Sequence, residues 1–227
     1  MSKKIEYNQV AGQRIQRTEA LSDGVFAIAM TLLVLDLKVP VSDALHSDKE
    51  LLQALAAMGP KILTYFIGFM TMGIFWVGQS SQLAFIEKSE RRLTWVSIFF
   101  LAFVSLVPFT TAFLSEHINS WVAIVLYWLN ILVLGTLLYI HWVCAYGSGF
   151  VTVTGEEGAH LNKAILRRIV TAQLLYASGA VAGVIYPLAG VGFIFLIQLN
   201  YALGLTMLIR KLFGGKHNDN ITSTPHS

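Results

Sequence analysis

Long apolar runs separated by short polar stretches dominate this 227-residue chain. A helix needs about 20 mainly apolar residues to cross the hydrocarbon core of a bilayer, and six segments meet that requirement. The predicted spans are 18–38, 61–86, 93–115, 120–146, 164–187 and 189–212. The pattern therefore predicts an all-α integral membrane protein with six transmembrane helices.

The composition agrees with this pattern. Apolar residues make up 55% of the chain, charged residues make up 13%, and the mean hydropathy is +0.63, far above that of a soluble domain. Because the six spans occupy most of the sequence, we expect one transmembrane domain over residues 1–213 and a disordered cytoplasmic tail at 214–227. The net charge of +3 reflects basic residues beside the spans and does not indicate nucleic-acid binding.

The basic residues divide unequally between the two sides of the membrane. If six helices alternate, 13 of the 16 Lys and Arg residues fall on one side, and only Lys38, Lys49 and Lys61 fall on the other. Cytoplasmic loops carry an excess of basic residues. We therefore expect a multi-pass protein with both termini in the cytoplasm. The same distribution favours six spans over five or seven, because an odd number would divide the basic clusters between the two sides.

The longest outer loop, 39–60, contains a helix-start signal. Ser47 and Glu50 stand three residues apart, as in a capping box, and predict a short amphipathic helix that breaks at Gly59-Pro60. We expect this helix to cover part of the outer surface.

The first span carries two acids, Asp23 and Asp36. An ionised carboxylate in an apolar segment is costly, so Asp23 requires a partner or a hydrated path. Only 12 residues separate the two acids, about 18 Å of helix, which is short for a helix surrounded by lipid. We therefore expect an inner helix that the others shield.

At 100° per residue, the first span has two different faces. An apolar stripe with a single hydroxyl lies within about 60° of one line and comprises Gly24, Ile28, Thr31, Leu32 and Leu35. The opposite face carries Asp23, Phe26 and Leu33. Periodicity alone is equally consistent with ordinary helix packing along this stripe. Asp23, on the opposite face, can fix the orientation of the helix without contacting an ion.

The residues of this span match a specific signature. The match comprises Arg17, Leu21, Ser22, Asp23, Gly24-Val25-Phe26-Ala27-Ile28-Ala29 and Thr31-Leu32-Leu33-Val34-Leu35. It closely resembles the first-helix motif of the transmembrane protein 175 family of potassium channels, in its short bacterial form. That motif is Arg, three residues, then Phe-Ser-Asp. The resemblance extends to Phe75-Trp76, Leu106-Val107-Pro108-Phe109, Thr111-Ala112 and the six-span layout.

The resemblance implies a homotetramer in the bacterial plasma membrane, with the first helix of each subunit lining a central pore for K⁺ and other monovalent cations. The family lacks the Thr-Val-Gly-Tyr-Gly filter of ordinary potassium channels, and so does this sequence. By resemblance, Ile28 forms the narrowest hydrophobic ring, Leu32 and Leu35 form further rings outward, and Thr31 places hydroxyls beside Ile28. K⁺ would pass transiently near Ile28 and Thr31, with no resident metal or cofactor.

The same resemblance assigns an anchor to the pore helix. Arg17, Ser22 and Asp23 would hold it against its neighbours, with the indole N–H of Trp76 as a partner. Asp36 would add negative charge at the outer mouth, or would simply be a solvated helix end.

This sequence departs from the family pattern in two places. Leu21 replaces the motif's Phe, and Gln79, Ser80 and Ser81 stand where family members carry histidines after the tryptophan. Gln79 can hydrogen-bond to Asp23 but cannot change its charge, so pH sensing by those histidines is not expected here.

Two other function classes were weighed. A secondary ion-coupled or proton-coupled transporter is the alternative, and Pro108 and Pro187 are candidate helix breaks, although no repeat of a three-helix unit is evident. An enzyme is not expected, because His141 is the only histidine well inside a span and the single Cys144 excludes a cysteine-based metal motif.

Overall fold

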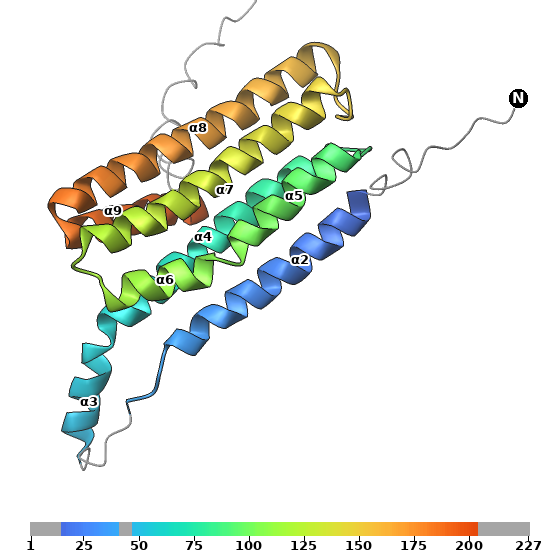
Figure 1. Ribbon diagram of the computed structural model, residues 1–227. Coiled ribbons are helices and arrows are strands. Elements are labelled where there is room, and N and C mark those ends of the chain that lie inside the picture. The colour runs from blue at the N-terminus through green and yellow to red at the C-terminus, as the bar shows by residue number, and fades with distance from the viewer. Residues whose placement is uncertain (1–14, 41–46, 204–227) are drawn as a thin grey trace, which may run out of the picture.

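The structure, a computed structural model, describes residues 15–40 and 47–203 (Figure 1). Helices make up nearly all of this part of the chain, which confirms the all-α prediction. The helices are α2 (Ile15–Leu32), the 3₁₀ turn η1 (Leu33–Asp36), α3 (Asp48–Ala57), α4 (Gly59–Leu83), α5 (Arg91–Val104), α6 (Val107–Glu116), α7 (Trp121–Gly147), α8 (Gly155–Ile185) and α9 (Pro187–Leu203).

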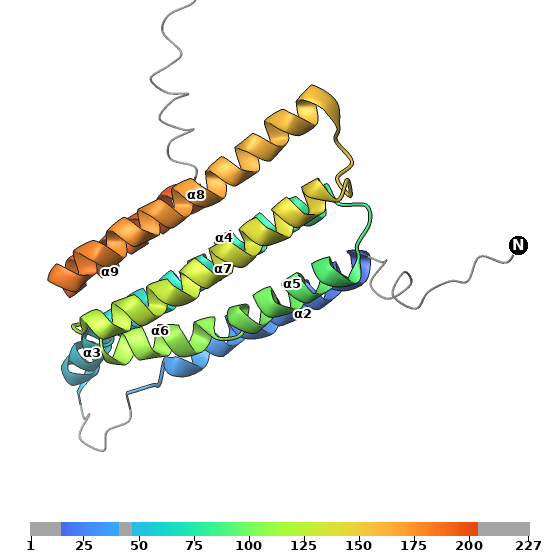
Figure 2. The same cartoon turned by 45° about the horizontal axis from the view of Figure 1, so that its top comes forward.

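The long helices form a layered bundle (Figure 2). α2 and α5 lie in one outer layer, α4 and α7 in the middle, and α8 and α9 in the other outer layer. α7 packs against α8 and α5, and α6 packs against α4 and α7. Fully buried side chains concentrate in the middle layer, where Ile67, Tyr127 and Trp142 are among the largest. α2 consequently lies at the edge of the subunit.

Five helical stretches are long and apolar enough to cross a membrane. They are Ile15–Asp36, Gly59–Leu83, Arg91–Glu116, Trp121–Gly147 and Gly155–Ile185. The described part of α9 has 17 residues, shorter than a typical span, and the predicted sixth window, 189–212, extends beyond residue 203. The six-span layout therefore stays a prediction, as does the tail at 214–227, which lies outside the described residues.

The third predicted span is two helices rather than one. α5 ends at Val104 and α6 begins at Val107, with Pro108 in its first turn. Proline has no N–H to donate to the Val104 carbonyl four residues earlier, and its ring disfavours helical backbone just before it. The chain therefore bends at Ser105-Leu106 and continues in a new direction.

α8 begins at Gly155, before the predicted start at 164. Its first turn carries Glu156 and Glu157, whose negative charges favour the positive end of the helix dipole. This polar extension has no apolar signal, so a hydropathy argument does not detect it.

The capping box predicted before α3 is present. The Ser47 side chain accepts from the Glu50 backbone N–H, and the Glu50 carboxylate accepts from the Ser47 N–H at 3.1 Å. α3 has no buried residue and extends away from the bundle (Figure 1).

A buried polar cluster joins three helices in the core. Thr71 on α4 lies 2.6 Å from the Tyr127 hydroxyl of α7 and accepts a 2.6 Å hydrogen bond from Gln198 Nε2 of α9. Polar side chains that bond across helices contribute to association in a membrane, where apolar contact with lipid competes with apolar contact between helices. The cluster therefore holds α9 in register with α4 and α7.

Two glycines allow α8 and α9 to pack closely. A Cβ atom on Gly190 would meet the backbone of Gly183, at 2.6 Å from its nitrogen, and the Gly179 carbonyl oxygen, at 2.9 Å. Backbone atoms cannot rotate away, so any larger side chain at position 190 forces the two helices apart.

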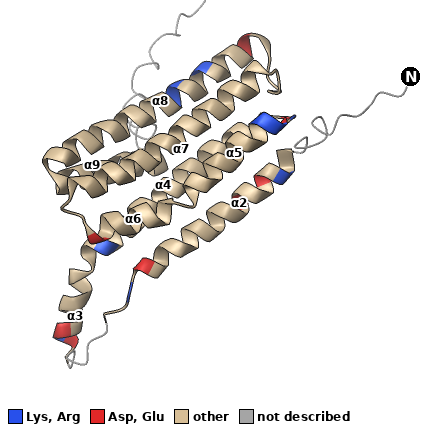
Figure 3. Ribbon diagram, viewed as in Figure 1, with Lys and Arg blue, Asp and Glu red and all other residues tan. Residues whose placement is uncertain are grey.

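Charged residues gather at the ends of the helices (Figure 3). The start of α2, the start of α5 and the first half of α8 carry basic residues, namely Arg17, Arg91, Arg92, Lys163, Arg167 and Arg168. The opposite end carries Asp36 at the end of η1, Lys61 at the start of α4 and Glu116 at the end of α6.

Candidate functional site

The apolar stripe predicted on the first span lies on the exposed face of α2 and η1. Ile28 is 63% exposed, Leu32 is 45% exposed and Leu35 is 69% exposed. An added Cβ on Gly24 would meet no atom within 4 Å. Much of the surface of the stripe is therefore uncovered by the described part of one chain.

The opposite face of α2 packs into the core. Phe26 and Leu33 are almost completely buried, and the Phe26 ring lies 6.1 Å from the Phe100 ring of α5. The expectation of a shielded inner helix is thus wrong within the described part of one subunit, because only one face of this edge helix is covered. Any cover over the exposed surface of Ile28 and Leu35 must come from outside the described part of one subunit.

Thr31 supplies the one hydroxyl of the stripe. It is exposed, and its Oγ1 donates to the Ile28 carbonyl oxygen at 2.8 Å. The hydroxyl proton is thereby directed back to the helix, which leaves the oxygen lone pairs facing away from it. An oxygen in this state can accept from water or coordinate a monovalent cation.

Two side-chain hydrogen bonds join α2 to α4. Trp76 Nε1 donates to Asp23 Oδ1 at 2.8 Å, and the Ser22 hydroxyl donates to Gln79 Oε1. Ser22 and Gln79 are buried, whereas Trp76 is 40% exposed. The Gln79 side chain therefore bonds to Ser22, and the bond to Asp23 comes from Trp76.

Arg17 is separate from this group. Its side chain is exposed one turn before Ser22, and it makes no hydrogen bond or ion pair with the residues that the structure describes. Three of the four predicted anchor residues thus come together, and Gln79 completes the second bond.

Asp36 ends η1 and lies beside a cavity of about 310 Å³ between η1, α4 and α6. Leu32 and Leu35 also line this cavity, together with Phe109 and Thr111 of α6. Asp36 is thus partly covered by its own subunit, and its role at an outer mouth stays a prediction.

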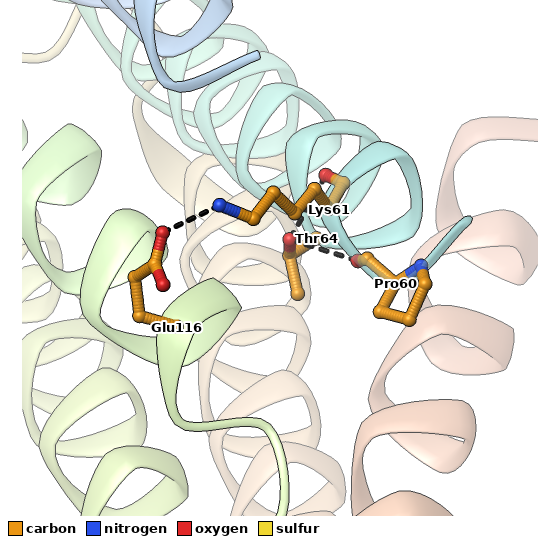
Figure 4. Close-up of polar contacts among 4 residues, drawn as sticks. All are labelled: Pro60, Lys61, Thr64 and Glu116. Carbon is orange, nitrogen blue, oxygen red and sulfur yellow. Dashed lines mark hydrogen bonds and ion pairs between the residues drawn. The ribbon is translucent and has the colours of Figure 1, made fainter. Parts of the chain in front are cut away.

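An ion pair closes the same end of the bundle (Figure 4). Lys61 Nζ, in the first turn of α4, lies 2.6 Å from Glu116 Oε1 at the end of α6. Thr64, one turn further on, donates to the Pro60 carbonyl oxygen at 3.0 Å. The pair connects α4 to the helix that follows the Pro108 break.

We expect this ion pair to contribute little to stability. Both side chains are partly exposed, and exposed pairs contribute about 0–1 kcal/mol. A double-mutant cycle with Lys61→Met and Glu116→Gln, read by thermal unfolding in detergent, should give a coupling free energy in that range. A coupling of several kcal/mol would show that the pair is desolvated by a neighbouring molecule.

The sequence offered weak signals for two of these contacts. Gln79 departs from the family pattern, but the departure does not predict its pairing with Ser22. That pairing depends on how α4 is rotated. Lys61 and Glu116 carry no motif, and only their positions at helix ends on one side suggested proximity. Among residues 15–40 and 47–203, no group of three His, Cys, Asp or Glu side chains is arranged to hold a metal ion.

Residues 17–108 match the family described as Endosomal/lysosomal potassium channel TMEM175. A potassium channel of Streptomyces collinus is 39% identical over 104 residues, 46% of this chain and 49% of that protein. A potassium channel of a Chryseobacterium species is 26% identical over 185 residues, 81% of this chain and 90% of that one. The crystal structure of a lysosomal potassium-selective channel TMEM175 homolog from Chamaesiphon minutus superposes with a TM-score of 0.72 at 27% identity, covering 84% of this chain and 97% of that one. Over residues 17–108 the chain is thus similar to the TMEM175 family, and its fold is that of the Chamaesiphon minutus homolog.

The matched region contains α2, the anchor and the Pro108 break. This chain spans about half the length of the Streptomyces relative. It spans 21% of the chicken endosomal/lysosomal proton channel TMEM175, to which it is 38% identical over 108 residues. The matched family model and the Streptomyces relative are both described as potassium channels.

Proposed function

We propose that this chain forms a K⁺-permeable cation channel in which four copies surround a central axis and α2 of each lines the pore. One observation carries the proposal: the face from Ile28 to Leu35 is exposed at the edge of the subunit, while the other face of α2 is packed. The family model described as a potassium channel matches residues 17–108, which include nearly all of this helix. A single chain cannot enclose a symmetric path with one such face, so several copies are required.

The constriction in this proposal consists of side chains. Ile28 forms the narrowest ring, and Leu32 and Leu35 form wider rings toward the outer end. Rings of branched apolar side chains expel water from a narrow pore, and a small displacement of the helices restores a hydrated path. Because the stripe contains no charge, the same apolar rings exclude water in the closed state and become hydrated when they are wider in the open state.

Thr31 gives this pore its modest preference for K⁺. Its hydroxyl oxygen can replace part of the hydration shell of an ion beside the Ile28 ring. K⁺ loses hydration more easily than Na⁺, so a tight and partly wet neck favours K⁺. Discrimination should be weaker than in a filter built from rings of backbone carbonyls.

The two hydrogen bonds to α4 set the rotation of α2 in this account. Ser22 and Asp23 are consecutive on α2, and their partners Gln79 and Trp76 are about one turn apart on α4, so the two bonds together determine which residues of α2 face the axis. Gln79 cannot change its charge, so the first bond is independent of pH.

We expect Trp76→Phe to weaken the anchor. It removes the N–H that donates to Asp23 and keeps an aromatic ring, so it should lower the free energy of unfolding by up to about 1.5–3 kcal/mol, the range for a hydrogen bond to a charged group. The measurement is thermal unfolding of the purified protein together with the resting K⁺ leak. Trp95→Phe is the matched control, because Trp95 is similarly exposed and makes no hydrogen bond with the described residues. Equal effects of the two variants would remove Trp76 from the anchor.

The proposed location is the plasma membrane of a bacterium, with both termini in the cytoplasm. The described basic residues gather toward the end of the bundle where α2, α5 and α8 begin (Figure 3). The excess of basic residues on the cytoplasmic side orients membrane proteins. The outer mouth is then the end with Asp36 and the Lys61–Glu116 pair.

The test is K⁺ efflux from liposomes that contain the purified full chain, followed by recording in planar bilayers. A channel gives unitary current steps and efflux that rises linearly with the K⁺ gradient. Saturable efflux that needs a counter-ion and shows no steps would support the secondary transporter instead. Cross-linking in detergent should reach four copies and stop there.

A further inference from the structure

A narrow cavity of about 80 Å³ opens between α4, α7 and α8 on the side of the subunit away from α2. Its walls are mainly apolar, formed by Ile74, Phe75, Leu138, Ile165, Ile169 and Ala172. Sites for whole small molecules are usually about 300–1,000 Å³. The cavity therefore suits the end of one hydrocarbon chain better than a soluble ligand.

A cation and a hydroxyl lie at the polar part of this cavity. Arg168 of α8 and Tyr201 of α9 both line it, and Arg168 is exposed. Arg168 and the neighbouring Arg167 make no hydrogen bond or ion pair with any described residue. One guanidinium group with no partner among the described residues, that of Arg168, thus lies beside an apolar crevice.

The position of Arg168 along α8 matches the depth of a lipid headgroup. It lies 17 residues before the end of α8 at Ile185, about 26 Å at 1.5 Å per residue, close to the thickness of the hydrocarbon core. The intervening Leu174 and Val181 are exposed, as lipid-facing side chains are. Arg168 consequently sits at the level of lipid phosphates, on the side where basic residues gather.

We propose that this crevice binds one anionic phospholipid, with its phosphate on Arg168 and Tyr201 and the end of one acyl chain between α4 and α8. Charge complementarity selects an anionic headgroup, since basic groups at the membrane surface attract anionic lipids with about 1 kcal/mol each. Arg is suited to phosphate because its N–H groups form a planar fork. The bound acyl chain fills space that protein side chains leave open between α4, α7 and α8. The site is separate from α2, so it does not depend on ion conduction.

The test is native mass spectrometry of the detergent-purified full chain with phosphatidylglycerol, and with phosphatidylcholine of the same acyl chains. Wild type should bind phosphatidylglycerol more tightly, and Arg168→Gln should weaken that binding about fivefold, the factor that corresponds to one basic contact. Ala172→Leu keeps the charges and narrows the crevice, and should weaken binding of the same lipid. Circular dichroism and size-exclusion chromatography establish that each variant is folded.

Arg92→Gln is the matched control, because Arg92 is an exposed cation at the same end of the bundle on α5, away from the crevice. If Arg92→Gln weakens binding as much as Arg168→Gln, the attraction is general and the proposal is wrong. It is also wrong if Ala172→Leu has no effect or if the two lipids bind equally. Glycerol phosphate at the same concentration should displace no lipid, and displacement would identify a plain phosphate site in place of a lipid site.

Discussion

K⁺ efflux from liposomes should rise by about tenfold or more when Ile28 is replaced by Asn. The isoleucine is 63% exposed on the face proposed to line the pore, where four such side chains would form the narrowest dry ring. An amide of similar size hydrogen-bonds to water, so the ring stays wet and the barrier falls. A decrease of only about 1.4 kcal/mol in that barrier gives a tenfold increase in rate.

Val181→Asn is the control for this result. Val181 is 65% exposed on α8, which lies in the layer opposite α2, so it presents a similar apolar surface to a different environment. This variant should leave K⁺ efflux at the wild-type level. Unchanged efflux with Ile28→Asn, or equal increases in both variants, would exclude Ile28 from the narrowest point.

Gly190→Ala should destabilise the bundle by about 1–3 kcal/mol, the usual cost of overpacking a dense interior. The added methyl group would meet the Gly183 backbone and the Gly179 carbonyl oxygen, which cannot rotate away. For a chain of this size, the loss corresponds to about 2–12 °C in the melting temperature. Thermal unfolding in detergent, followed by circular dichroism, is the measurement.

Gly192→Ala offers a control in the same helix. A Cβ on Gly192 would meet no atom within 4 Å, and alanine is the better helix former by about 1 kcal/mol. This variant should be neutral or slightly stabilising. If the two variants unfold at the same temperature, α8 and α9 do not cross closely at Gly190.

Much of the fold follows from local physics that a sequence expresses directly. Apolar length predicts the long helices, Ser47 and Glu50 predict the start of α3, and 100° per residue separates the Ile28 face from the Phe26 face. Pro108 was noted as a candidate break, and α5 does end shortly before it. These features depend on residues within a few turns of one another.

The remaining features depend on how helices are rotated and paired. The bond between Ser22 and Gln79 spans 57 residues, and periodicity does not determine which of two nearby acceptors a side chain reaches. The resemblance assigns Arg17 to the anchor, yet its side chain is exposed and bonds to none of the described residues. The polar start of α8 has no apolar pattern, so only the structure shows that this helix begins at Gly155.

The most direct test of the pore face is cysteine accessibility at Leu35, in a Cys144→Ala background that contains no other thiol. Leu35 is 69% exposed near the outer end of the stripe, where a charged methanethiosulfonate reagent arrives without crossing the Ile28 ring. The account predicts that modification of Leu35→Cys from the outer side abolishes most of the K⁺ current, while Leu188→Cys on α9 is unaffected. Full current after complete modification at position 35 would contradict the claim that α2 lines the conduction path.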